Sequence, residues 1–116
     1  RERRMDIRQI DENVSVAGQP TPAEMRMVAE QGFRSVIGNR PDGEEPGQPA
    51  WKELEAAAQD AGLQTQFIPI GGAEDIEARK DDFAQALKDL PGPVLAFCRT
   101  GTRSGMLYEA SRSADG

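Results

Sequence analysis

Short apolar segments alternate with amphipathic segments along most of this chain. The apolar segments, each of which predicts a strand, are 7–10, 14–17, 33–37, 63–70 and 94–97. The amphipathic segments, each of which predicts a helix, start at Thr21 and end before Gly32, cover about 49–61, cover about 74–90, and begin again near Ser104. This alternation predicts an α/β fold in which helices flank a mostly parallel central sheet.

Capping and turn residues mark the ends of the predicted helices. Thr21 suits the N-cap of the first helix, Pro22 its first position, and Glu24 the third position of a capping box. Gly32 ends that helix, and the segment 91–93, Pro-Gly-Pro, ends the third. The apolar side chains expected to face the core are Met25, Val28, Ala29, Trp51, Leu54, Ala57, Ala58, Ile76, Phe83, Ala86, Leu87 and Leu90.

The last predicted strand leads directly to the one cysteine of the chain. Residues 94–97 are all apolar, which is typical of a strand buried on both faces of a parallel sheet. Ligands of such sheets bind beyond the carboxyl ends of the strands. Cys98 follows this strand at once, so the sequence predicts a functional site there.

Length and composition limit the classes of protein to consider. A chain of 116 residues has room for a single domain, which we expect over 5–116, with 1–4 as upstream sequence. A net charge of −6 argues against nucleic acid as a partner. No apolar run approaches the ~20 residues of a membrane span, and no secretory signal is visible. A lone unpaired cysteine fits a reducing compartment, so we expect a cytoplasmic protein.

The absence of histidine narrows the chemistry further. The chain has no histidine, so catalytic Cys-His and Ser-His pairs and histidine-ligated zinc are excluded. It also lacks the acidic loop of a calcium site. We therefore expect neither a metal nor a cofactor.

The segment from Cys98 to Gly105 has the composition of an anion-binding loop. A glycine that lets the backbone turn its N–H groups inward, together with a helix N-terminus, stabilises a thiolate or a bound anion. The alternative is a buried structural cysteine followed by a polar turn, but two arginines, a glycine and three hydroxyl groups in six positions favour function. The predicted catalytic residues are Cys98 and Arg103, and the predicted substrate-binding residues are Arg99, Thr100, Gly101, Thr102, Ser104 and Gly105.

Two families resemble this chain. Residues 98–103, Cys-Arg-Thr-Gly-Thr-Arg, resemble the active-site loop of rhodaneses. Residues 18–21, 32–41 and 92–95 resemble the cysteine-dependent phosphatase superfamily. The combination is similar to the β-lactamase-hydrolase-like, phosphatase-like domain family, also described as a sulfurtransferase family, from about Met5 to Arg112. This resemblance implies a dual-specificity-like phosphatase fold and cysteine-based chemistry on anions.

The spacing within the loop bears on the reaction. The phosphatase motif, His-Cys-x5-Arg, has its arginine six positions after the cysteine, whereas Arg103 lies five after Cys98 and Phe97 replaces the histidine. The shorter loop suits a persulfide better than a phosphoryl group. The phosphatases also use an acid from a separate loop, and the matching segment 69–73 has none. Other candidate acids are Asp42, Glu74 and Asp75.

The sequence therefore favours a rhodanese-type sulfurtransferase with a Cys98 persulfide as intermediate. Its expected partners are a small anionic sulfur donor, thiosulfate or a persulfide, and a thiol or cyanide acceptor. One alternative is a tyrosine- or dual-specificity-like phosphatase that forms a phosphocysteine at Cys98. A second alternative is a non-catalytic module that binds anions or persulfides. The Pro/Gly-rich segment 40–49 can border the same pocket, with Arg40 as a further anion contact.

Overall fold

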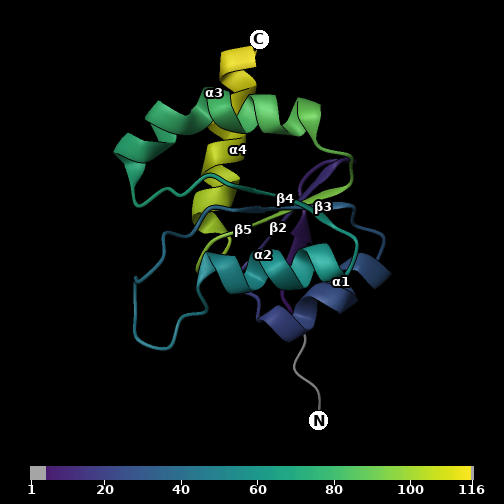
Figure 1. Cartoon of the computed structure of the whole chain (residues 1–116). Helices are drawn as coiled ribbons and strands as arrows, with labels where there is room; N and C mark the ends of the chain where they lie inside the picture. Colours follow the sequence, from purple (N-terminus) through teal and green to yellow (C-terminus); the bar gives the residue numbers. More distant parts are fainter. Residues whose placement is uncertain (1–4, 116) are drawn as a thin grey trace.

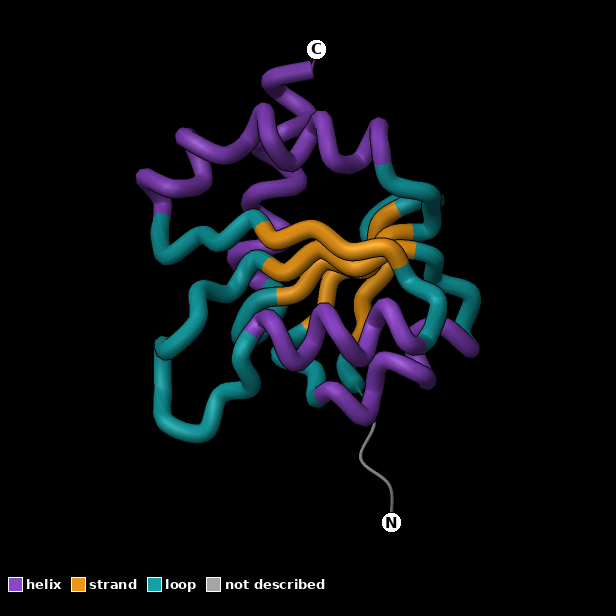
Figure 2. Tube along the Cα trace, in the orientation of Figure 1, coloured by secondary structure: helices purple, strands orange, loops and turns teal. Residues whose placement is uncertain are grey.

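A computed structural model describes residues 5–115, so that Gly116 and the predicted upstream segment 1–4 lie outside the described residues. A five-stranded sheet separates two layers of helices (Figures 1 and 2). The strands are β1 (Ile7–Gln9), β2 (Val14–Ala17), β3 (Ser35–Gly38), β4 (Gln64–Phe67) and β5 (Val94–Phe97). The helices are the 3-10 turn η1 (Pro22–Glu24), α1 (Met25–Glu30), α2 (Trp51–Asp60), α3 (Ala73–Asp89) and α4 (Thr102–Asp115).

The strands lie in the order β1-β2-β5-β3-β4. Only β1 pairs antiparallel with its neighbour, and the other three pairings are parallel, which confirms the predicted fold class. β5 lies in the centre, where its last residue, Phe97, is in register with Ala17 of β2 and Gly38 of β3. Three strands therefore end side by side, and the residues that follow them meet at one edge of the sheet.

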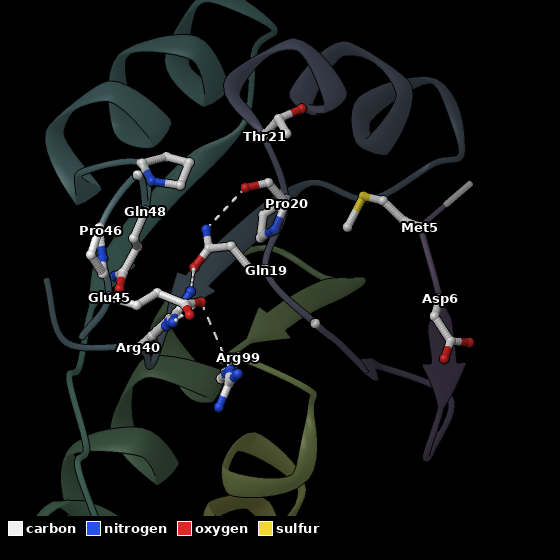
Figure 3. Close-up of a pocket in the computed structure, with 13 residues that line it drawn as sticks. Met5, Asp6, Gln19, Pro20, Thr21, Arg40, Glu45, Pro46, Gln48 and Arg99 are labelled. Atoms are coloured by element: carbon white, nitrogen blue, oxygen red, sulfur yellow. Dashed lines mark hydrogen bonds and ion pairs between the residues drawn. The ribbon is translucent and has the colours of Figure 1, made fainter. Parts of the chain in front are cut away.

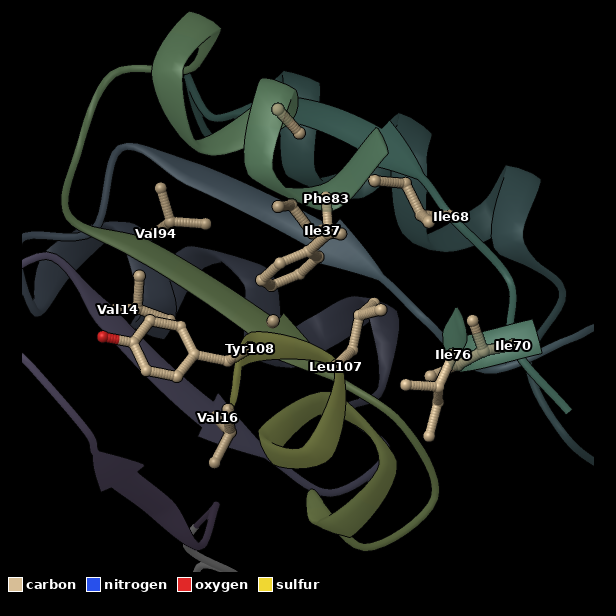
Figure 4. Close-up of a cluster of buried hydrophobic side chains, with 12 residues drawn as sticks. Val14, Val16, Ile37, Ile68, Ile70, Ile76, Phe83, Val94, Leu107 and Tyr108 are labelled. Atoms are coloured by element: carbon tan, nitrogen blue, oxygen red, sulfur yellow. The ribbon is translucent and has the colours of Figure 1, made fainter. Parts of the chain in front are cut away.

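Both faces of the central strand are buried, as its apolar sequence predicts. Val94 and Ala96 belong to a core cluster shared with α3 and α4, which Figure 4 shows around Phe83 and Tyr108. Leu95 and Phe97 point to the opposite cluster, shared with α1 and α2. Because the whole of β5 is fixed from two sides, the position of the next residue is fixed with it.

Several element boundaries differ from the sequence-based prediction. The helix expected from Thr21 begins as η1 and continues as the short α1, although the Glu24 carboxylate does accept the Thr21 N–H (2.8 Å) as in a capping box. The last helix begins at Thr102 rather than Ser104. The strand expected over 63–70 is regular only over 64–67, after which the chain still follows β3 through bonds from the N–H groups of Ile68 and Ile70.

Gly38 at the end of β3 offers a test of this packing. A Cβ at Gly38 would lie 2.6 Å from the Trp51 ring, which stacks on Phe67 at 5.1 Å, so Gly38→Ala has to displace a buried aromatic group. We expect the free energy of unfolding to fall by about 1–3 kcal/mol in urea denaturation. Gly72→Ala is the matched control, because its Cβ would meet nothing within 4 Å, and its stability should stay close to the original. Equal losses in both variants would contradict this packing.

Candidate functional site

The loop after β5 is built into the carboxyl edge of the sheet. The Cys98 N–H donates to the carbonyl of Ala17 (3.2 Å), which extends the β2–β5 pairing by one residue. The next carbonyl, that of Arg99, accepts the N–H of Gln19 (3.2 Å). Gly18 lies close enough that a Cβ there would come within 3.0 Å of the Arg99 carbonyl oxygen. The segment after β2 therefore supports one side of the loop.

Gly101 allows the loop to turn into α4. Its φ of +97° lies in the left-handed region, and a Cβ would lie 3.4 Å from the Ala17 backbone. The Gly101 carbonyl then accepts the N–H of Gly105 (3.0 Å) in the first turn of α4. The first N–H groups of this helix, which have no partner within the helix, are thereby turned toward the end of β5.

Main-chain N–H groups converge on the sulfur of Cys98. Only 1% of this residue is exposed, and its Sγ accepts the N–H of Gly101 at 3.1 Å. Burial raises the pKa of the Cys98 thiol, whereas the N–H groups of Ser104, Thr100 and Gly101 lower it. The lowering is the larger effect, so the net pKa is below that of an ordinary cysteine. The loop is thus suited to hold a thiolate.

A buried hydrogen-bond chain ties this loop to the neighbouring strands. The Ser104 hydroxyl donates to Oδ1 of Asn39 (2.8 Å), and the Asn39 amide donates to the Ile68 carbonyl (2.8 Å). Ser104 and Asn39 are fully buried, so these bonds are shielded from water. Sequence reasoning missed Asn39, although its place directly after a predicted strand, as for Cys98, is a usable signal.

Arg103 reaches toward the sulfur but is engaged by a carboxylate. Its Nη1 and Nη2 lie 2.7 and 2.8 Å from the two carboxylate oxygens of Glu44, and Nη1 also donates to the Ile70 carbonyl (2.9 Å). The bond from Arg103 lowers the pKa of Glu44 to about 2 against partial burial, so this carboxylate is ionised at neutral pH. Contact with Glu44, and also with the Cys98 sulfur, raises the pKa of Arg103. Sequence reasoning missed Glu44, even though it singled out the segment 40–49.

Arg40 is bound by side chains of its own loop and of the segment after β2. It is buried, and its guanidinium donates to Glu44 (2.9 Å), Glu45 (2.9 Å) and the side-chain oxygen of Gln19 (3.1 Å), as Figure 3 shows for the last two. These bonds use three of the five N–H donors of the guanidinium. The structure thus gives Arg40 a structural role, and its contact with an anion stays a prediction.

The structure gives the other predicted binding residues different roles. The N–H groups of Thr100, Gly101 and Ser104 face the sulfur, whereas the hydroxyls of Thr100 and Thr102 bond to each other (3.1 Å). The Gly105 N–H is used within the helix start. The Arg99 side chain lines a neighbouring cavity of about 580 Å³, where its Nε lies 3.8 Å from Oε1 of Glu45 (Figure 3).

The structure engages two of the three predicted candidate acids with backbone N–H groups away from Cys98. Asp42 accepts the N–H of Trp51 (2.8 Å) at the start of α2, and Asp75 accepts the N–H of Gly71 (2.7 Å). Glu74 is an exposed residue in the first turn of α3. Asp42 and Asp75 are thus engaged as caps of backbone N–H groups.

Among residues 5–115, no group of three or more His, Cys, Asp or Glu side chains is arranged to hold a metal ion. Nor does this part of the chain contain a helix with the length and hydropathy of a transmembrane span.

Comparison with known sequences gives close relatives. A beta-lactamase hydrolase-like protein of Agrobacterium fabrum is 43% identical over 107 residues, which is 92% of this chain. One of Xylella fastidiosa (strain Temecula1) is also 43% identical, over 112 residues or 97% of this chain. The chain spans about a quarter of the length of these relatives, 25% and 26%.

Comparison with solved structures shows the fold. A "putative phosphatase" of Neisseria meningitidis superposes with a TM-score of 0.79 at 33% identity, covering 95% of this chain and 78% of that one. The catalytic core of the PP-IP phosphatase Siw14 of S. cerevisiae has a TM-score of 0.63 at 15% identity, covering 92% and 64% of the two chains. The second likeness concerns the fold alone, and it confirms the predicted cysteine-phosphatase fold.

The family model agrees with both comparisons. The model described as "Beta-lactamase hydrolase-like protein, phosphatase-like domain" matches residues 6–115, nearly the whole chain. This is the family that the loop and its flanking segments resemble in sequence, so that resemblance is confirmed. The chain belongs to the beta-lactamase hydrolase-like, phosphatase-like domain family.

Proposed function

We propose that this domain is a cysteine-dependent group-transfer enzyme whose nucleophile is Cys98 and whose transferred group is a sulfane sulfur. The single observation that carries this proposal is the hydrogen bond (3.1 Å) from the Gly101 N–H to the buried Cys98 sulfur, whose pKa the amides of Thr100 and Ser104 lower as well. Such donors stabilise an anionic sulfur before reaction and the terminal sulfur of a persulfide after it. Arg103 supplies a positive charge beside the same atom.

The proposed reaction is a double displacement. The Cys98 thiolate attacks the outer sulfur of thiosulfate, a Cys98–S bond forms, and the sulfur–sulfur bond of thiosulfate breaks. Sulfite leaves with the electron pair of that bond, and Cys98 becomes a persulfide anion. An acceptor thiolate or cyanide then attacks the terminal sulfur, which returns Cys98 to its thiolate. Neither step requires a proton from the protein.

The local geometry supports sulfur as the transferred group. The loop places Arg103 five residues after Cys98, one fewer than the phosphatase motif, so its ring of donors is smaller. Hydrolysis of an alkyl phosphate is assisted by an acid that protonates the leaving oxygen. Glu44 is the carboxylate held on Arg103, and its pKa of about 2 keeps it deprotonated while this pair exists. The smaller ring favours sulfur as the group that is held, and the ionised Glu44 favours a reaction that needs no proton from the protein.

Phosphate-ester hydrolysis is the second candidate, and the comparisons favour it over sulfur transfer. The family description and the structural neighbours are phosphatase-like, and none of those cited above is described as a sulfurtransferase. In this reaction Cys98 would attack phosphorus, the ester oxygen would leave, and water would release the phosphocysteine. A fold accommodates more than one chemistry, so the loop itself has to decide between the two.

Mass spectrometry of the intact protein separates the two candidates. After incubation with thiosulfate, we expect the mass to rise by one sulfur atom, because the buried donors stabilise the Cys98 persulfide, and to return on addition of cyanide. Cys98→Ser is the matched control and should gain nothing. Absence of the adduct, together with phosphate release from an aryl phosphate, would establish the phosphatase instead. An adduct that no acceptor removes would indicate a binding module.

Substitution of the candidate acids gives an independent prediction. Asp75→Asn and Glu74→Gln remove the two acids near the start of α3 while nearly preserving their shapes. We expect the rate of thiosulfate:cyanide sulfur transfer to change less than about twofold, because sulfite leaves without a proton. A loss of 10²-fold or more in either variant, the typical size of a general-acid contribution, would contradict the proposed reaction.

A further inference from the structure

One buried hydroxyl proton lies between two acceptors at the start of α4. We propose that Asn39 is a positioning residue for the nucleophile: it competes with the Cys98 sulfur for the proton of the Ser104 hydroxyl, and it thereby sets how strongly the thiolate is held. This inference rests on the proposed use of Cys98 as the nucleophile. It does not depend on which group is transferred.

The contacts of Asn39 fix the direction of its side chain. Its amide nitrogen donates to the Ile68 carbonyl (2.8 Å), and its Oδ1 accepts the Ser104 hydroxyl (2.8 Å). The main chain of Asn39 is held as well, because its N–H donates to the Phe97 carbonyl (2.8 Å) and its carbonyl accepts the Ile70 N–H (2.8 Å). Turning the amide over would bring its oxygen against the Ile68 carbonyl, so Asn39 presents a fixed acceptor to Ser104.

The same hydroxyl also reaches the Cys98 sulfur. The Ser104 side chain lowers the pKa of Cys98 through a hydrogen bond to the sulfur, in addition to the bond from its own main-chain N–H. A serine hydroxyl carries one proton, so it donates to one acceptor at a time. Cys98 is 1% exposed and Ser104 and Asn39 are 0% exposed, so bulk solvent does not compete for either acceptor. The sulfur and the Asn39 oxygen therefore share one proton.

The charge on the sulfur decides which acceptor takes the proton. A hydrogen bond to an ionised acceptor is roughly twice as strong as one to a neutral acceptor. When Cys98 is a thiolate, the hydroxyl turns to the sulfur, and Oδ1 of Asn39 loses its donor. When the sulfur is neutral, as a thiol or as the inner sulfur of a persulfide, the hydroxyl returns to Asn39. The stabilisation that Ser104 gives the thiolate is thus partly offset by the bond that Asn39 loses.

This competition affects both halves of the proposed reaction. Cys98 is the nucleophile in the first half and the leaving group in the second. The nucleophilicity of a thiolate falls with the pKa of its thiol, whereas a thiolate of lower pKa leaves faster. By limiting the stabilisation from Ser104, Asn39 keeps the sulfur reactive in the attack, while the proton is still available when the thiolate is released.

Titration of paired variants tests the competition without any turnover. We would follow the ultraviolet absorbance of the Cys98 thiolate against pH for the original protein, Asn39→Ala, Ser104→Ala and the double variant, after thermal unfolding has shown that each is folded. Ser111→Ala is the matched control, because Ser111 is also a buried serine of α4 but donates to the Tyr108 carbonyl (2.7 Å) within the helix.

We expect Ser104→Ala to raise the midpoint, because the thiolate loses a donor, and Asn39→Ala to lower it, because the proton is freed for the sulfur. Each shift should correspond to about a fivefold to tenfold change in the acid dissociation constant, the size of one buried hydrogen bond. The double variant should match Ser104→Ala, and Ser111→Ala should match the original protein. If Asn39→Ala does not fold, Asn39→Asp takes its place: its charged acceptor should raise the midpoint, and by less when the Ser104 hydroxyl is absent.

An Asn39→Ala shift of the same size with and without the Ser104 hydroxyl would overturn the inference, since Asn39 would then act through the backbone of the loop. An unchanged or raised midpoint in Asn39→Ala would also overturn it, as would equal shifts in Ser104→Ala and Ser111→Ala. These titrations contain no thiosulfate, so the thiosulfate adduct tests sulfur transfer separately. Coupling between Asn39 and Ser104 without an adduct would uphold the role of Asn39 and reject sulfur transfer.

Discussion

The site depends on the opposition between burial of the Cys98 sulfur and the main-chain N–H groups directed at it. Burial alone would keep the thiol protonated and unreactive. The bond from Gly101 at 3.1 Å and the neighbouring amides of Thr100 and Ser104 reverse that effect, so the pKa of Cys98 is lowered. The left-handed turn at Gly101 and the register of β2 and β5 are what bring these donors together.

Around this sulfur, the chain combines a phosphatase-like scaffold with an altered site. Residues 6–115 match the family model, and the fold is that of cysteine-based phosphatases. Within that frame, the loop is one residue shorter than the phosphatase motif, and the carboxylate on Arg103 comes from the β3–α2 loop. The scaffold explains where Cys98 lies, and the shorter loop and the carboxylate on Arg103 distinguish this site from the phosphatase motif.

The sequence predicted the features that depend on local pattern. The apolar run 94–97 identified a strand buried on both faces, and it placed Cys98 at the carboxyl edge of the sheet, as observed. What it could not predict are the side-chain pairings between distant segments. Glu44 and Arg103 are 59 positions apart, and Asn39 and Ser104 are 65 apart. No periodicity in the sequence marks either pair. In the same way, the sequence did not show that Glu44 and Glu45 bind Arg40, which was expected to contact an anion.

The ionisation of Cys98 is the most direct test of this account. Because it is the one cysteine in the chain, the ultraviolet absorbance of its thiolate can be followed against pH, with Cys98→Ser as the baseline. The account predicts a midpoint well below the ~8.5 of a free cysteine, because the converging amides outweigh burial. A midpoint at or above that value would show that burial dominates, and it would contradict a nucleophilic role for this sulfur.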